Sequence, residues 1–159
     1  MPIPTSPIST TIIMVSLLSI FLLTSYYSGI LAVSYKADAS TADLRGVASL
    51  VASQLLEAVN YAYGLDVGGM VMVKLSMPDE CPLGPYSITV SSSNGVATLT
   101  LKPTFQSAVT VNIKLPISPY IFNIMESTVY SGVRWNYVRI VRVDSSNFTL
   151  ELVYVGGGG

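Results

Sequence analysis

The first 35 residues contain no Asp, Glu, Lys or Arg, and residues 12–33 form 22 nearly unbroken apolar or small residues. A helix of about 20 apolar residues spans the hydrocarbon layer of a bilayer. Twelve of these residues are Leu, Ile, Phe or Val. Each favours membrane insertion by about 0.3–0.6 kcal/mol, which sums to roughly −4 to −7 kcal/mol before polar members are counted. We therefore expect the segment to lie in a membrane or against copies of itself.

The helix predicted for this segment continues into a stretch of different character. Ser6 is suited to the N-cap and Pro7 to the first helical position. No proline occurs between Pro7 and residue 63, and Gly64 is a natural stop. Apolar residues at three- and four-residue steps predict one buried face in the second half. That face consists of Leu44, Val47, Ala48, Val51, Leu55, Ala58, Val59 and Ala62.

The remaining chain has the pattern of an antiparallel β domain. Runs rich in β-branched and aromatic residues occur at 71–77, 86–90, 96–101, 109–115, 135–143 and 148–155. Asn94-Gly95 predicts a tight hairpin, and residues 144–147 a second one. Residues 121–129 fit a strand or a short helix. We predict an α+β fold, with a helical segment (residues 1–64) packed on a β-sandwich or partly open barrel (residues 65–159).

The composition argues against catalysis and metal binding. Histidine is absent, and Cys81 is the only cysteine, so the commonest general base and any cysteine metal cluster are excluded. Eight Lys or Arg oppose nine Asp or Glu without a basic stripe, so we expect no nucleic-acid binding. Asp79-Glu80 is interpreted as a solvated loop tip. We predict no enzymatic activity, no cofactor and no metal.

The apolar run does not have the form of a cleaved secretory signal. No basic residue precedes it, and it exceeds the usual 7–15 residues. We expect it to belong to the mature protein. Met1-Pro2 fits two explanations, an untrimmed initiator or a residue that was internal to a longer precursor with a leader.

Small and modifiable residues add three expectations. Ser25 with Gly29, and Ser28 with Ala32, are small pairs four residues apart that allow close helix–helix approach. Tyr26 and Tyr27 within the apolar run suit an interface or a neighbouring helix. Asn147-Phe148-Thr149 is a sequon on a predicted turn, which makes Asn147 a candidate N-glycosylation site.

This layout resembles the archaeal type IV pilin-like superfamily, which includes adhesion pilins and archaellins. The resemblance lies in the start at residues 6–13, the apolar helix that becomes amphipathic, and the β domain behind it. The strand–turn–strand of residues 72–78 and 84–90 is also similar. The resemblance implies a membrane-held precursor, removal of a leader and helical assembly with the apolar helices at the filament core. Thr5 stands where bacterial type IV pilins have glutamate, so an archaeal type fits better.

The sequence thus predicts a pilin, the structural subunit of an extracellular type IV pilus-like filament used for surface adhesion. Its partners would be copies of itself, the membrane before assembly, and a surface or cell receptor. Two alternatives stay open: an archaellin of a motility filament, and a single-pass membrane-anchored extracellular binding protein. The residues expected in the filament core are Ile12, Ile13, Leu17, Leu18, Phe21, Leu22, Ser25 and Gly29.

Overall fold

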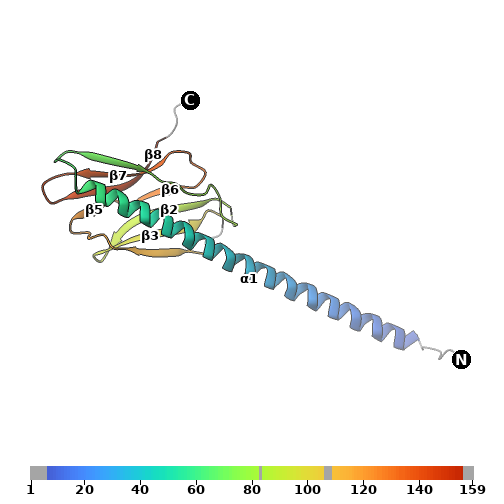
Figure 1. Ribbon diagram of the computed structural model, residues 1–159. Helices are drawn as coiled ribbons and strands as arrows, with labels where there is room; N and C mark the ends of the chain where they lie inside the picture. The colour runs from blue at the N-terminus through green and yellow to red at the C-terminus, as the bar shows by residue number, and fades with distance from the viewer. Residues whose placement is uncertain (1–6, 83, 106–108, 156–159) are drawn as a thin grey trace. The chain divides into compact units, whose positions relative to one another are not determined.

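The described part of the chain forms one long helix followed by eight strands. The computed structural model describes residues 7–82, 84–105 and 109–155. Helix α1 (Pro7–Ala62) has 56 residues and begins at the proline expected for its first position. The predicted N-cap Ser6, and Thr5, lie outside the described residues. The predicted α+β class is confirmed (Figure 1).

The strands form two four-stranded sheets. Sheet one has the order β1-β7-β8-β5 and sheet two the order β4-β3-β2-β6. Sheet one comprises β1 (Met70–Lys74), β7 (Asn136–Arg142), β8 (Phe148–Tyr154) and β5 (Phe122–Ile124). Sheet two comprises β4 (Val111–Leu115), β3 (Val96–Pro103), β2 (Tyr86–Ser93) and β6 (Ser127–Tyr130).

One pairing departs from the predicted antiparallel arrangement. β5 pairs with β8 in parallel, with Phe122 opposite Phe148. Parallel neighbours need a long connection. Here the chain leaves β5, forms β6 in the other sheet and returns through β7 before it reaches β8. The ambiguous residues 121–129 therefore supply two short strands, one to each sheet.

Both predicted hairpins are present. Asn94 and Gly95 connect β2 to β3 and have φ angles of 51° and 74°. Positive φ at both central residues is what a tight two-residue hairpin requires. Between β7 and β8, Val143 N donates to Asn147 O at 2.9 Å. The carboxylate of Asp144 accepts hydrogen bonds from the backbone N–H groups of Ser146 and Asn147, which closes the turn.

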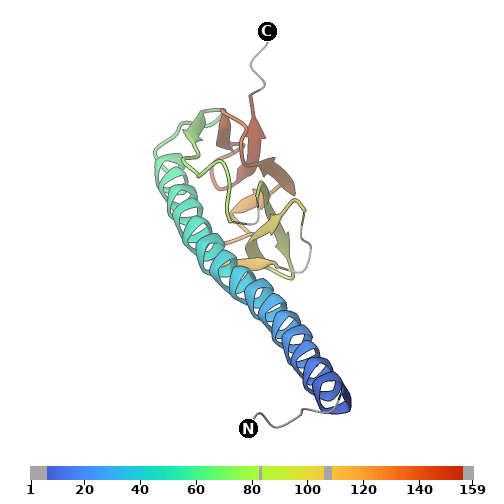
Figure 2. The same cartoon turned by 90° about the vertical axis from the view of Figure 1, so that its right-hand side faces the viewer.

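A single hydrophobic core joins both sheets to the second half of α1. The inner faces of β2 and β3 contribute Ile88, Val90, Leu99 and Leu101, which are fully buried, while β7 and β8 contribute a second layer that includes Ile140 and Leu150. The part of α1 from Leu44 to Ala62 contributes side chains to this core. Figures 1 and 2 show this part of the helix running along the strands. Alternating burial along β2 and β3 follows the two-residue period of a strand with one face covered.

The compact units of the chain are residues 1–37 and residues 38–159. This division differs from the predicted boundary at residues 64 and 65, although both place the apolar run in the first part. The physical reason is that the second half of α1 is part of the core of the β domain. We call residues 10–35 the apolar half of α1 and residues 38–62 its amphipathic half.

Candidate functional site

The apolar half of α1 exposes its large side chains. Ile12 is 61% exposed, Phe21 67% and Leu22 59%. Ile13, Leu17 and Leu18 are likewise more than half exposed, and Ser25 and Gly29 are exposed. Single exposed apolar residues are normal, but a continuous apolar surface marks a site of contact with protein or lipid. The eight residues expected in a filament core therefore all lie on this exposed surface.

The polar side chains of this half are compatible with an apolar environment. Ser19 Oγ donates to Val15 O at 2.8 Å, and Thr24 Oγ1 donates to Ile20 O at 2.7 Å. Such bonds to the preceding turn satisfy the hydroxyl proton within the helix. By length and composition, α1 is the one helix among the described residues that could cross a membrane.

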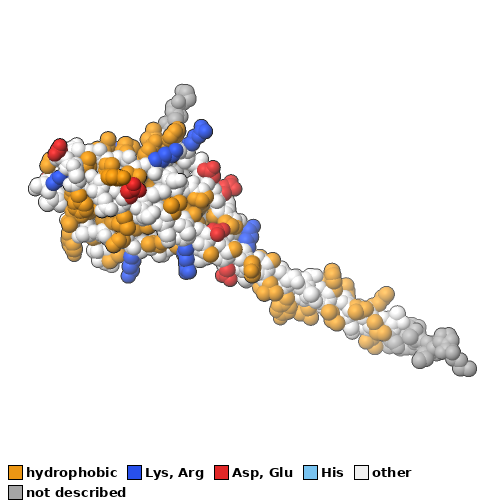
Figure 3. Space-filling view, viewed as in Figure 1, with side chains coloured by type: hydrophobic (Ala, Val, Ile, Leu, Met, Phe, Trp, Pro, Cys, Tyr) orange, Lys and Arg blue, Asp and Glu red, His pale blue; other side chains and the backbone are white. Residues whose placement is uncertain are grey.

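A shallow groove on the apolar half surrounds Gly29. It has a volume of about 450 Å³ and is lined by Ser25, Tyr26, Gly29, Ile30, Val33 and Ser34. A Cβ atom added at Gly29 would meet no atom within 4 Å, so the position is open in the isolated chain. The rings of Tyr26 and Tyr27 meet edge to face with centroids 6.0 Å apart. The missing side chain at Gly29 thus leaves room for a neighbouring surface (orange side chains mark the apolar residues in Figure 3).

The amphipathic half buries the face that the sequence indicated. Leu44, Val51, Leu55, Ala58 and Ala62 are fully buried; Val47 and Val59 are at least nine-tenths buried. Gln54 is not one of the apolar residues of this face; its side-chain amide accepts from Ser76 N at 3.0 Å and donates to Ser76 O at 3.3 Å. This paired amide contact fastens the helix to the loop after β1. Nothing in the helical period could have revealed it, because it depends on where that loop lies.

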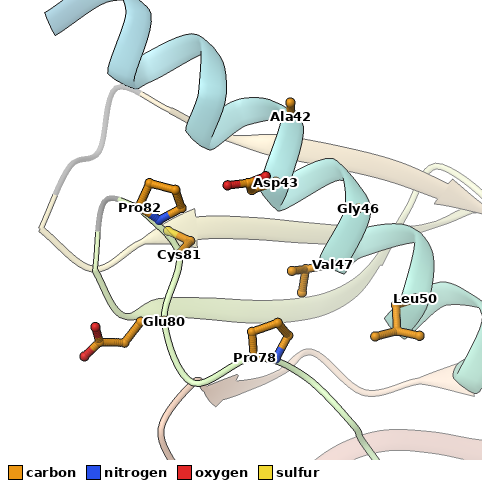
Figure 4. A pocket seen from close by; sticks show the side chains of 9 residues that line it. All are labelled: Ala42, Asp43, Gly46, Val47, Leu50, Pro78, Glu80, Cys81 and Pro82. Carbon is orange, nitrogen blue, oxygen red and sulfur yellow. The ribbon is translucent and has the colours of Figure 1, made fainter. Parts of the chain in front are cut away.

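A second groove lies between the amphipathic half and the loop that precedes β2. It has a volume of about 410 Å³, and its walls are mainly apolar, from Val47 and Leu50 on the helix and Pro78 and Pro82 on the loop (Figure 4). Cys81 is half-buried there, and its thiol donates to Gly84 O at 3.2 Å. Asp43 and Glu80 add carboxylates to the rim. Among the described residues, no three His, Cys, Asp or Glu side chains are grouped to hold a metal ion.

The loop beside this groove is held by a buried tyrosine. Tyr86 Oη donates to Pro78 O at 2.6 Å, and Tyr86 N donates to Ser131 Oγ at 2.9 Å. Burial raises the pKa of Tyr86 to about 12, with smaller electrostatic contributions from the nearby Cys81 and Asp79 side chains. The phenol is therefore protonated, and it acts as a structural donor.

Two arginines on β7 are engaged within the domain. Arg139 forms an ion pair with Glu151 across β7 and β8. Arg142 donates to the backbone carbonyls of Leu65, Asp144 and Ser145. Arg142 therefore ties the segment after α1 to the β7–β8 turn, and its role is structural.

The candidate glycosylation site lies at that turn. Asn147 is exposed, and its side-chain amide donates to Asp144 Oδ2 at 2.7 Å. The hydrogen bonds from Asn147 and Ser146 lower the pKa of Asp144 to about 2. The amide that a glycan would modify is thus accessible, although it is engaged with a carboxylate.

Comparison with known proteins identifies no relative: no family model, curated protein or solved structure matches the chain.

Proposed function

We propose that the protein is the structural subunit of an extracellular type IV pilus-like filament, which polymerises through the apolar half of α1 and serves in surface adhesion. The observation that carries the proposal is the contrast within one helix. The amphipathic half is covered by the β domain, whereas Leu18 and Leu22 of the apolar half are 60% and 59% exposed. Such a surface requires lipid or protein around it.

In the proposed function, the apolar half is surrounded first by lipid and then by protein. The apolar half is long enough to hold a precursor in the membrane and then to leave lipid for the core of a filament. Burial of about 1,000 Å² of apolar surface corresponds to roughly 25 kcal/mol before opposing terms. Loss of lipid contacts and of subunit freedom reduces this gain strongly. The groove at Gly29 supports close packing of helices, since small residues allow backbones to approach.

The test is whether the chain forms fibres that depend on the apolar half. Material sheared from the cell surface should pellet as filaments of this chain, and electron micrographs should show them. Leu18→Lys or Leu22→Lys should abolish the filaments, because an unpaired charge in an apolar core is costly. Lys36→Gln, at the end of the apolar run, serves as the matched control and should assemble normally.

Two results would contradict the filament, and a third would contradict its role in adhesion. Normal fibres with lysine at position 18 or 22 would show that the apolar half is not the core. Recovery of the chain only in detergent extracts, as single particles, would favour the membrane-anchored binding protein instead. Loss of swimming in cells that lack the chain would identify a motility filament rather than an adhesive one.

A further inference from the structure

The outer face of sheet two is mainly polar. β2 and β3 alternate buried apolar residues with partly exposed polar ones, so the polar side chains point away from the core. Hydroxyl groups predominate among them. We call this surface the hydroxyl face, and its centre consists of Ser87, Thr89, Ser91, Thr98 and Thr100.

A row of hydrogen-bonding side chains crosses all four strands of this face. Thr128 lies opposite Thr89, Thr89 opposite Thr100, and Thr100 opposite Asn112. The Oγ1 atoms of Thr89 and Thr128 are 2.8 Å apart, and Thr100 Oγ1 donates to Asn112 Oδ1 at 2.8 Å. Neighbouring strands lie about 4.8 Å apart, so the row extends over about 14 Å. These bonds hold the side chains in place, while each hydroxyl keeps acceptor sites for a ligand.

The charge on the hydroxyl face is positive. Lys102 and Lys114 are exposed, and they belong to rows on either side of the central row: Lys102 lies opposite Ser87, and Lys114 lies opposite Thr98. The two rows are four residues apart along β3, which corresponds to about 13 Å. The paired residues of this face include no Asp or Glu; Glu126 comes just before β6, at the opposite edge from β4. Figure 3 shows basic side chains along the lower margin of the β domain.

The outer face of sheet one differs in kind. Met70 and Met72 are exposed there, 54% and 40%, and Met72 lies opposite Arg139. Arg139 is neutralised by its ion pair with Glu151. Sheet one therefore presents a mixed apolar surface whose central arginine is neutralised, whereas sheet two presents hydroxyls between two lysines that form no ion pair with any described residue.

We propose that the hydroxyl face binds an anionic polysaccharide, a polymer of sugar rings that carries carboxylates. Hydroxyl and amide groups match the hydroxyls of sugars as donors and acceptors. The ammonium groups of Lys102 and Lys114 match carboxylates, and the absence of acidic residues from the paired strands removes repulsion. Tyr130, at the edge of the sheet, is the one aromatic residue of the face within the paired strands. Bases of single-stranded nucleic acid bind by stacking on aromatic rings, so a polysaccharide fits better.

This inference does not depend on the filament, and its test uses the full chain in detergent micelles. The probe is alginate, a polymer of uronic acids, and binding is measured by biolayer interferometry at low and physiological salt. Wild type should bind alginate and should not bind dextran, its neutral counterpart. Lys102→Glu/Lys114→Glu should weaken binding by about tenfold or more, because two attractive charges become repulsive.

Two further variants distinguish recognition by the hydroxyl face from attraction by positive charge alone. Lys36→Glu/Lys74→Glu makes the same change in net charge at two residues that are not part of sheet two, and its affinity should stay within about twofold of wild type. Thr89→Val/Thr100→Val removes hydroxyls without a change in charge and suits a strand, so the fold should persist while binding falls several-fold. An unchanged thermal midpoint verifies folding in each variant.

Three outcomes would overturn the proposal. Wild type that does not bind alginate lacks the inferred site. Equal loss in both double lysine variants would assign binding to net charge. Equally tight binding of a double-stranded DNA fragment would show a general affinity for polyanions rather than recognition of a polysaccharide.

Discussion

The two halves of α1 are both rich in apolar residues, but they differ in arrangement and burial. In the apolar half these residues lie on all sides of the helix, and Leu22 is 59% exposed. In the amphipathic half they follow one face, and Leu55 is fully buried. One continuous helix therefore contains a segment covered by its own β domain and a segment whose apolar surface is available to lipid or to another protein surface.

The comparison shows that hydrophobic content does not decide what covers a helix; its angular distribution does. A one-sided stripe matches one covering layer, and the two sheets provide that layer for residues 38–62. A helix that is apolar all round needs partners on every side. The first segment should therefore control assembly, and the second should control the stability of the folded domain.

The same truncation in each half of α1 tests whether only the amphipathic half stabilises the folded domain. Leu55→Ala should lower the free energy of unfolding of the β domain by about 2–5 kcal/mol, because it opens a cavity in the core. Leu22→Ala should change it by less than about 0.5 kcal/mol, as expected for an exposed position. Denaturant unfolding in detergent, followed by the fluorescence of Trp135, measures both.

The paired truncation has a clear contrary result. If Leu22→Ala destabilised the domain as much as Leu55→Ala, the two halves would form one cooperative unit. The division at residues 37 and 38 would then have no energetic meaning.

Much of this organisation could be predicted from the sequence, because it follows from periodicity and local turn chemistry. The start of the helix at Pro7, the face that contains Leu55 and the Asn94-Gly95 hairpin all depend on neighbours in the chain. The parallel pairing of β5 with β8 could not be predicted, since it is decided by which sheet receives β6. The same holds for Gln54, whose contact with Ser76 joins residues 22 positions apart.

The candidate site divides in the same way. The exposed residues of the apolar half could be named from composition alone, because no other element has that pattern. The row from Thr128 to Asn112 could not be assembled from sequence, since it requires the register of three strand pairings.

The stability of the β domain should also depend on alkaline pH, through the buried Tyr86. Tyr86 has a pKa raised to about 12 by burial, against 10.0 normally. A raised pKa in the folded state contributes stability that is complete below pH 10 and is lost as the pH rises through about 12. The domain should therefore unfold more easily above pH 10. Tyr86→Phe should cost about 1 kcal/mol at neutral pH, because Pro78 O loses its donor.

The measurement for Tyr86 is urea unfolding between pH 7 and pH 12, with Tyr61→Phe as a control. Tyr61 also has a raised pKa, through its hydrogen bond to Glu57, but it is exposed. Its loss should leave the domain almost unchanged. An alkaline profile in Tyr86→Phe identical to that of wild type would remove Tyr86 as its cause.

Helical glycines provide the third and smaller comparison. A Cβ atom added at Gly46 or at Gly29 meets no atom within 4 Å. Gly46→Ala should stabilise the domain by about 0.5–1 kcal/mol, because glycine loses more backbone freedom on helix formation than alanine. Gly29→Ala should leave domain unfolding unchanged, and Gly29→Leu should weaken assembly by filling the groove. Thermal unfolding and filament yield measure these effects, and normal filament yield with leucine would contradict close packing at Gly29.

The smallest expected effect concerns acid, to which the apolar half should be indifferent because residues 1–35 contain no Asp or Glu. Hydrogen bonds from Asn147 and Ser146 lower the pKa of Asp144 to about 2, from an ordinary 3.8. A lowered pKa in the folded state gives stability that is present above about pH 4 and is lost as the pH falls through about 2. Asp144→Ala should therefore lower the urea midpoint slightly at pH 7, and most of this difference should be lost at pH 2. A difference that stayed undiminished at pH 2 would assign the effect to the shape of the turn instead of the carboxylate. Filaments that came apart between pH 4 and pH 2 would show that assembly through the apolar half depends on acidic groups elsewhere in the chain.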